Sequence, residues 1–176
     1  VELVTGPVSL ATPASVTRTD VSSASEMHAC VMAKTANAHI FIGVAAVSDY
    51  RPKHVQSQKI KKDQAKGERL DIELVQNADI AACVASSRPA VYTVGFAAET
   101  QALEQHAREK RLRKGLDMII ANDVSDRSIG FNSDDNAVTV VWDGGESSIA
   151  TTPKPELATI LIERIAEQYH RSAKAR

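Results

Sequence analysis

The sequence predicts a single α/β domain over residues 1–176, with a Rossmann-like, mainly parallel sheet and helices on both faces. Three observations predict this fold. Short β-rich runs alternate with helical stretches along the chain. Several of these runs are continuously apolar, as expected for strands that helices cover on both sides. The chain has 176 residues, 43% apolar and 24% charged, which is enough for one domain with a buried core.

The predicted elements follow one another in regular order. Six segments have the composition of strands: 1–4, 39–47, 70–75, 91–95, 117–121 and 137–142. Four segments are predicted to be helices: 23–36, 79–86, 99–115 and 154–173. Ser23 and Glu26 have the spacing of a capping box at the first helix, and Pro153 lies near the first turn of the last. The segments 51–69 and 123–136 are polar and predicted to be irregular.

The overall composition argues against several function classes. A net charge of -1 provides no global field to recruit nucleic acid or an anionic membrane, so we expect neither partner. The sequence has no long apolar run and no recognisable signal peptide, so we expect a cytoplasmic protein. Cys30 and Cys83 lack metal-binding or redox spacing and are interpreted as buried, reduced thiols.

The first candidate site is the end of the strand 39–47. There the segment Gly43-Val44-Ala45 brings small residues to the strand end, and Asp49 follows soon after. In open α/β sheets, ligands bind beyond the carboxyl ends of the strands. Small residues would let a flat ligand approach the backbone, and Asp49 suits a ribose hydroxyl or a metal ion. The alternative is that Asp49 only caps a turn.

Two groups of lysines are candidates for binding a polyphosphate. Lys59 opens the basic run KIKK within the polar segment 51–69. Lys110 and Lys114 are four residues apart, which places them on one face of the helix predicted over 99–115. Two ammonium groups on one face can hold an anion, although solvated basic surface is the alternative for both groups.

Two further strand ends carry candidate residues. In the segment 94–100, VGFAAET, a strand is expected to give way to glycine and small residues before a helix start, where anions bind well. Phe96 would stack on a base there or simply fill the core. Asn122 lies in a polar strand end, ANDVS, and is a candidate for substrate binding. Neither a GxxxxGK[ST] nor a GxGxxG motif is present.

Seven segments in order resemble one known family. They are LVTGPVSL, GVAAVSDYRP, KIKK followed by NADI, VGFAAET, KRLRKGLD, ANDVS and GFNSDDN, and together they span essentially the whole chain. The resemblance is to the phosphopantothenoylcysteine synthetase domain of the bifunctional bacterial phosphopantothenoylcysteine decarboxylase/phosphopantothenate–cysteine ligase of coenzyme A biosynthesis.

The resemblance implies a specific reaction. The family joins 4'-phosphopantothenate to L-cysteine with CTP, through an acyl-cytidylate, and releases pyrophosphate and CMP. It implies Mg²⁺ accompanying CTP and a homodimer. FMN belongs to the decarboxylase half of the bifunctional protein, which this sequence does not contain.

The resemblance also assigns residues. Nucleotide-binding residues are Gly43, Val44, Ala45, Asp49, Lys59, Ala78, Asp79, Ile80, Ala81, Phe96, Lys110 and Lys114. By analogy, the backbone of 78–81 reads the cytosine edge and the lysines face the triphosphate. Lys59 has a catalytic role in turning over the acyl-cytidylate. Asp49 is also the candidate metal ligand, through Mg-CTP.

The sequence departs from the family pattern in three places. Ala78 stands where the family usually has Pro, and Ser48 where it usually has Ala. The family's first strand and its phosphate loop are expected before Val1. Without them we expect only a nucleotide half-site and no turnover.

Other interpretations stay open at this stage. A dinucleotide-dependent Rossmann oxidoreductase would need a glycine fingerprint that the sequence lacks. A non-catalytic nucleotide-binding module would share the fold. For the homodimer, the expected interface is the region 123–142, where the strand AVTVVW would pair with a partner at the sheet edge.

Overall fold

The structure, a computed structural model, describes residues 1–61, 70–99, 103–123, 133–172 and 174. Its centre is a five-stranded sheet in the order β3-β6-β7-β8-β9. The strands are β3 (Ile40–Gly43), β6 (Tyr92–Glu99), β7 (Met118–Asp123), β8 (Asp135–Trp142) and β9 (Gly145–Pro153). The first three run parallel, and β8 and β9 add an antiparallel edge.

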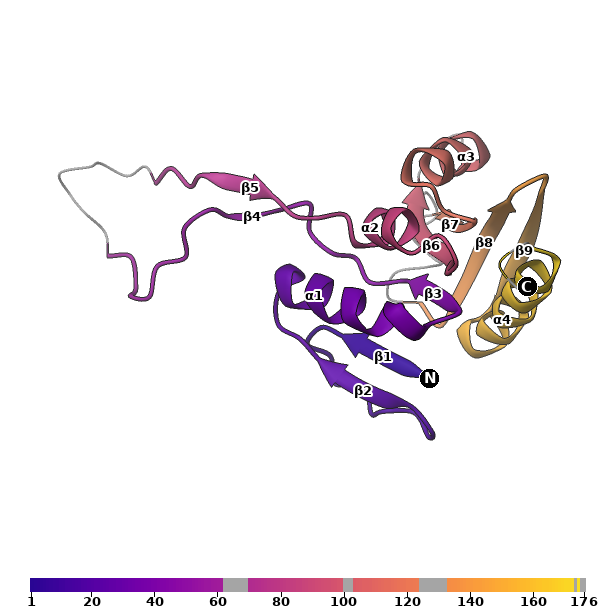
Figure 1. Ribbon diagram of the computed structural model, residues 1–176, viewed down its shortest axis with the longest axis horizontal. Coiled ribbons are helices and arrows are strands. Elements are labelled where there is room, and N and C mark those ends of the chain that lie inside the picture. Colours follow the sequence, from indigo (N-terminus) through magenta and orange to yellow (C-terminus); the bar gives the residue numbers. More distant parts are fainter. Residues whose placement is uncertain (62–69, 100–102, 124–132, 173, 175–176) are drawn as a thin grey trace.

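Helices cover both faces of this sheet, which confirms the predicted α/β, Rossmann-like class (Figure 1). α4 (Lys154–Arg171) lies on one face, whereas α2 (Ile80–Ser87) and α3 (Leu103–Lys114) lie on the other. Alternation along β7 explains the two layers: Met118 and Ile120 pack toward α4, and Ile119 packs toward α3. A strand buried on both faces must be apolar throughout, as β7 is.

A smaller unit precedes the sheet. β1 (Glu2–Thr5) and β2 (Thr17–Asp20) form a parallel pair, and α1 (Ala24–Lys34) packs on β1 and on α2. Ser23 caps α1 as predicted, because its hydroxyl accepts from the Glu26 amide at 3.2 Å. The Glu26 carboxylate reaches back one residue further than a capping box requires, to the Ser22 amide at 2.8 Å.

The parallel strands are split between two sheets. Among the described residues, β1 pairs with β2 alone and β3 pairs with β6 alone. Nevertheless, Val4 of β1 and Phe41 of β3 contribute to the same apolar cluster beneath α1 and α2. Each of the two strands therefore keeps one edge that no described strand pairs with.

Several predicted boundaries were wrong. β3 ends at Gly43 instead of residue 47, and β5 (Leu74–Gln76) is shorter than its prediction. β6 continues to Glu99, because its pairing with β7 extends to Asp123 and satisfies the backbone groups of both strands. The segment 95–98 is therefore strand, and the helix start predicted there lies further on. β2, β4 and β9 were not predicted.

The predicted dimer strand is also corrected. β8, which contains AVTVVW, pairs with β7 on one side and β9 on the other. Both of its edges are occupied, so it cannot pair with a partner at a sheet edge. The loop part of that prediction, 124–132, lies outside the described residues.

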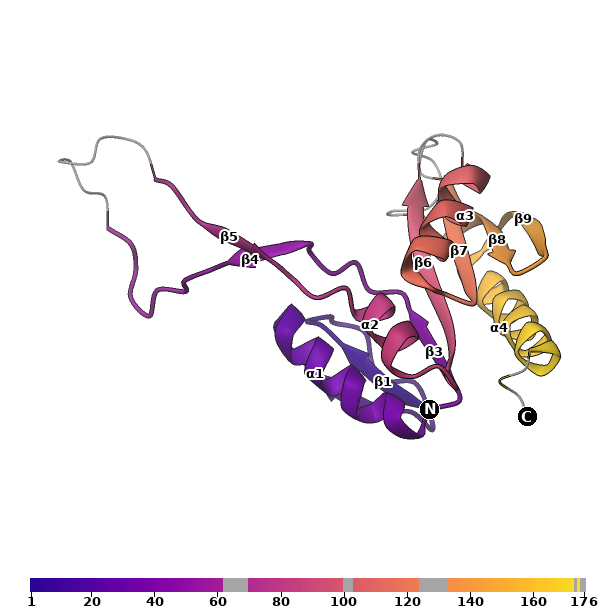
Figure 2. The same ribbon diagram turned by 45° about the horizontal axis from the view of Figure 1, so that its top comes forward.

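The segment 51–69, predicted to be irregular, begins within a strand of a two-stranded arm, and its residues 62–69 lie outside the described residues. β4 (Tyr50–Pro52) pairs antiparallel with β5, and the two strands extend away from the rest of the molecule in both views (Figures 1 and 2). Between Ser48 and Gln76, no described side chain is buried. The arm thus contributes little to the core of its own chain.

Candidate functional site

The ends of the parallel strands gather the predicted site segments. Gly43 of β3 is in register with Gly95 of β6, which is in register with Ile119 of β7. The three strands run in the same direction, but β6 and β7 continue four residues beyond this level, to Glu99 and Asp123, so β3 ends short of its neighbours. Val44, Ala45 and Asp49 follow β3 and are exposed there, as a ligand-contacting segment must be.

Asn77 joins two of these segments. Its backbone amide donates to the Asp49 carbonyl at 2.7 Å, and its side-chain amide donates to the Ser48 carbonyl at 2.8 Å. These bonds bring the 43–49 segment beside Ala78 and Asp79. Sequence reasoning missed Asn77, although an amide directly before a helix start is typical of a residue that makes local backbone contacts.

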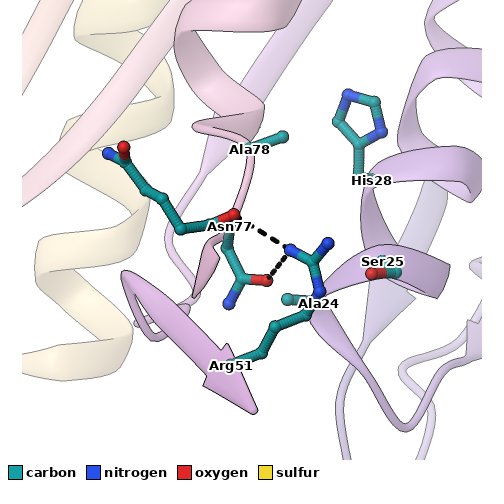
Figure 3. Close-up of a pocket in the computed structure, with 7 residues that line it drawn as sticks. Ala24, Ser25, His28, Arg51, Asn77 and Ala78 are labelled. Atoms are coloured by element: carbon teal, nitrogen blue, oxygen red, sulfur yellow. Dashed lines mark hydrogen bonds between the residues drawn. The ribbon is translucent and has the colours of Figure 1, made fainter. Parts of the chain in front are cut away.

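A cavity of about 490 Å³ adjoins this junction (Figure 3). It lies between the first turns of α1, with Ser25 and His28, and the base of the arm. Arg51 lines the opposite side, where its guanidinium donates to the Gln76 carbonyl at 3.0 Å and to Asn77 Oδ1 at 2.9 Å (Figure 3). The cavity thus presents a cation, an imidazole and a hydroxyl next to Ala78. None of these lining side chains was singled out from the sequence.

Asp79 joins the start of α2 to the end of α3. Its Oδ1 accepts from the Ala82 amide at 3.1 Å and so caps α2. Its Oδ2 pairs with Lys114 Nζ at 2.8 Å. Partial burial raises the pKa of Asp79, but the bonds from Lys114 and Ala82 outweigh it, so the net pKa is lowered and the carboxylate stays ionised. A second cavity, of about 450 Å³, lies beside this pair.

Ile80 and Ala81 continue from Asp79 into α2, whereas Phe96, Lys110 and Lys59 lie on other segments. Ile80 is buried beneath α1 and Ala81 is half-buried. Phe96 is half-buried and packs against the α4-side core, the alternative role foreseen for it. Lys110 is half-buried on α3, and Lys59 is exposed beyond β4.

Asn122 stands at the end of β7 on the same face as Ile120. It is half-buried, and its Oδ1 has no hydrogen-bond partner among the described residues. A buried amide oxygen without a partner is costly, which makes this atom a candidate for receiving a hydrogen bond from a ligand.

The described residues do not form a resident metal site. Among them, no three His, Cys, Asp or Glu side chains are close enough to hold a metal ion. Asp49 provides one exposed carboxylate. Nor is any helix in the described part of the chain long and apolar enough to span a membrane.

Several known proteins are similar to this chain in sequence. A family profile described as the DNA/pantothenate metabolism flavoprotein C-terminal domain matches residues 1–169. The coenzyme A biosynthesis bifunctional protein CoaBC of Vibrio cholerae is 52% identical over 96% of this chain and 42% of the relative. The protein of that name from Escherichia coli K12 is 49% identical over the same shares. The chain thus spans about two fifths of these relatives.

Solved structures agree on the fold. A crystal structure of the C-terminal domain of the CoaBC protein superposes with a TM-score of 0.78 at 31% identity, over 97% of this chain and 77% of that one. A Cab2 mutant in complex with phosphopantothenate-cysteine has a TM-score of 0.63 at 15% identity, over 89% of this chain and 53% of that one. At that identity the likeness concerns the fold alone.

Proposed function

The chain belongs to the family of the DNA/pantothenate metabolism flavoprotein C-terminal domain, and from this premise we propose that it is the synthetase domain of a coenzyme A biosynthesis enzyme. The proposed reaction is the CTP-dependent ligation of 4'-phosphopantothenate with L-cysteine through an acyl-cytidylate. The observation that carries the proposal is the convergence of the 43–49 segment, the 78–81 segment and Lys114, which Asn77 and Asp79 connect.

The arrangement suits the first step of this chemistry. A carboxylate is a poor acyl donor until its oxygen becomes part of a good leaving group. In the first step, the carboxylate oxygen of 4'-phosphopantothenate attacks the α-phosphate of CTP and displaces pyrophosphate, which makes CMP the leaving group of the next step. The charge of the triphosphate must be neutralised for that attack, and we assign this role to Lys59, Lys110 and Lys114. Exposed backbone at 78–79 offers hydrogen-bonding groups to the edge of the cytosine.

In the second step, the cysteine amine attacks the activated carbonyl and CMP leaves. We assign turnover of the acyl-cytidylate to Lys59 and contact with the pantothenate part to Asn122, whose buried Oδ1 can accept a hydrogen bond. Mg²⁺ would arrive with the phosphates of CTP, with Asp49 as one protein contact. FMN has no role in this domain and belongs to the decarboxylase half.

Pyrophosphate release tests the reaction. The protein should release pyrophosphate with CTP, 4'-phosphopantothenate and Mg²⁺. We expect Lys59→Met to lower kcat about 100-fold. Lys61→Met is the matched control, because Lys61 is an equally exposed lysine in the same run, and should change kcat less than about twofold. An absence of CTP-dependent pyrophosphate release would remove the proposal.

Calorimetry with CTP, ATP and NAD separates the alternatives. Selective CTP binding with turnover supports the ligase. CTP binding without turnover favours a non-catalytic nucleotide-binding module. Tight NAD binding favours the dinucleotide-dependent oxidoreductase and excludes the ligase. For the ligase we propose a cytoplasmic location, where its substrates are made.

We also propose that the protein is a homodimer and that the arm forms the interface. The described part of the arm exposes six large apolar side chains: Tyr50 at 58%, Val55 at 86%, Ile60 at 56%, Leu70 at 60%, Ile72 at 59% and Leu74 at 54%. The two short strands of the arm pair only with each other. A second arm related by a two-fold axis would pair with their free edges and cover these side chains.

Sedimentation or light scattering tests the dimer. The natural chain should be dimeric at micromolar concentration, and Ile72→Lys should make it monomeric, because a charge would then face the partner arm. Ile162→Lys is a matched control: Ile162 lies on α4, away from the arm, and is similarly exposed at 55%. A chain that stays monomeric across this range would contradict the proposal.

A further inference from the structure

The Asp79 carboxylate binds two elements with two different oxygens. Oδ1 accepts from the Ala82 amide at the start of α2, and Oδ2 pairs with Lys114 Nζ at the end of α3. Capping a helix requires a single acceptor, which a serine hydroxyl also supplies. The second oxygen of Asp79 is therefore not needed for the cap, and its partner is one of the lysines assigned to the triphosphate.

The position of this pair links two halves of the proposed nucleotide site. On one side, Asp79 belongs to the 78–81 segment whose backbone is assigned to the base. On the other, Lys114 is the last residue of α3, and Gly115 ends the helix with a φ of +66°. Lysine has a long flexible stem, so an ammonium group already held in place loses less freedom when a phosphate binds.

The charge of Asp79 also argues against direct contact with the nucleotide. A carboxylate near a triphosphate repels it unless a cation neutralises that carboxylate. Lys114 is such a cation, and its side chain is 25% exposed against 43% for Asp79, so the pair is partly shielded from water. The geometry therefore favours an action of Asp79 through Lys114.

We propose that Asp79 is a positioning residue that couples base recognition to triphosphate binding by holding Lys114 beside the 78–81 segment. The inference rests on the proposed function, because it requires that the protein bind CTP. It differs from the family-based assignment, in which the 78–81 segment acts through its backbone. Here the Asp79 side chain has a separate role.

The test is a double-mutant cycle on CTP binding, measured by calorimetry. Asp79→Ser keeps a cap for α2 but removes the partner of Lys114, and we expect CTP binding to weaken about tenfold. Lys114→Met should weaken it at least as much. The double variant should bind CTP no more weakly than Lys114→Met alone, because Asp79 acts through that lysine.

Inorganic tripolyphosphate is the second probe, because it carries the charge but no base. Asp79→Ser should change its binding less than about twofold, since a phosphate chain that no base anchors can shift to meet the freed lysine, and the removal of a negative charge offsets the lost ordering of that lysine. A merely structural role of Asp79 would weaken both ligands equally. Glu146→Ser is the matched control: Glu146 pairs with Arg108 of the same helix α3 at 2.5 Å, from β9, and its loss should leave CTP binding unchanged.

The outcomes separate this inference from the proposed function. If the natural protein binds no CTP, both the proposed function and the role of Asp79 are contradicted. A protein that binds CTP normally, but in which the Asp79 and Lys114 effects add or Asp79→Ser has no effect, removes the inference alone. If Asp79→Ser lowers Tm more than Glu146→Ser does, Asp79→Asn, which also caps helices, takes its place in the cycle.

Discussion

The central sheet and the arm use apolar side chains in opposite ways. In β6, β7 and β8, side chains such as Val94, Met118 and Val140 are fully buried between the helices. In the arm, Ile72 and Leu74 are more than half exposed. The arm is more polar than the sheet, and its few large apolar side chains differ from those of the sheet in what covers them. The sheet is covered by its own chain, whereas the arm needs a partner to bury the same kind of residue.

The largest expected effect is a loss of stability when a side chain of the sheet core is truncated, whereas truncation on the arm should have little effect. Met118→Ala should lower the free energy of unfolding by about 2–5 kcal/mol, because it leaves a cavity among side chains that cannot collapse fully. Leu74→Ala should change it by less than about 0.5 kcal/mol in dilute protein. Urea titrations of both variants measure this difference.

Protein concentration serves as the control for this comparison. If a second copy covers the arm, Leu74→Ala should lower the midpoint of the urea unfolding curve only at protein concentrations where the dimer forms. The reason is that association adds to the apparent stability of the folded protein. Met118→Ala should lower it at every concentration. A large loss for Leu74→Ala in dilute protein would show that the arm packs on its own chain.

The next effect is the titration of a buried tyrosine in the sheet. Tyr92 is 3% exposed, and burial, reinforced by the nearby Asp117 charge, raises its pKa to about 12 from 10.0. Its neutral form is favoured in the folded state. The resulting stability is fully present below pH 10 and is lost as the pH rises from 10 to 12.

This loss should amount to about 2–3 kcal/mol. Tyr92→Phe removes the titrating group. The free energy of unfolding of this variant should therefore fall less between pH 10 and 12 than that of the natural protein. Unfolding by urea at several pH values between 9 and 12, with both proteins, measures the difference. Parallel curves for the two proteins would contradict the prediction.

The smallest expected effect is the loss of stability when an ion pair is broken, at the rim of the sheet or on the arm. Asp117 accepts from the Thr93 amide at 2.7 Å and from Lys174 Nζ at 2.8 Å, and the acid and lysine side chains are 21% and 23% exposed. Asp117→Ala leaves the buried Thr93 amide without this acceptor, so we expect a loss of about 1–3 kcal/mol.

Lys53 and Glu73 form the matched pair on the arm, at 2.6 Å with side chains 45% and 62% exposed. Water screens this pair, so Glu73→Ala should cost less than about 0.5 kcal/mol. Thermal unfolding of both variants at low protein concentration compares the two pairs. Equal losses would mean that the difference in exposure does not govern their contributions.

The sequence predicted the central layers well because its signals there are local. The apolar runs predicted at 91–95, 117–121 and 137–142 correspond to β6, β7 and β8, and the helix predicted over 154–173 corresponds to α4, which covers one face of them. β4 and β9 were missed because both are polar or short, and their pairing depends on a neighbouring strand that no local pattern reveals.

The candidate site was predicted in its parts but not in its connections. Asp49, Lys110 and Lys114 were nominated from strand ends and helix periodicity, and the 78–81 segment from family resemblance. Asn77 and the pairing of Asp79 with Lys114 were not predicted, because they join residues 28 or more positions apart or depend on which oxygen faces which helix. Such contacts follow from packing.

By itself, the sequence determined the α/β class, the family and the strand ends that could bind a nucleotide. Those depend on periodicity, composition and ordered motifs, which are properties of neighbouring residues. The tertiary structure decided that β8 is an inner strand, that the described residues 48–61 and 70–76 form an arm, and that Asp79 holds Lys114. These features depend on which surfaces meet in space, because burial and pairing are settled only when the whole chain packs.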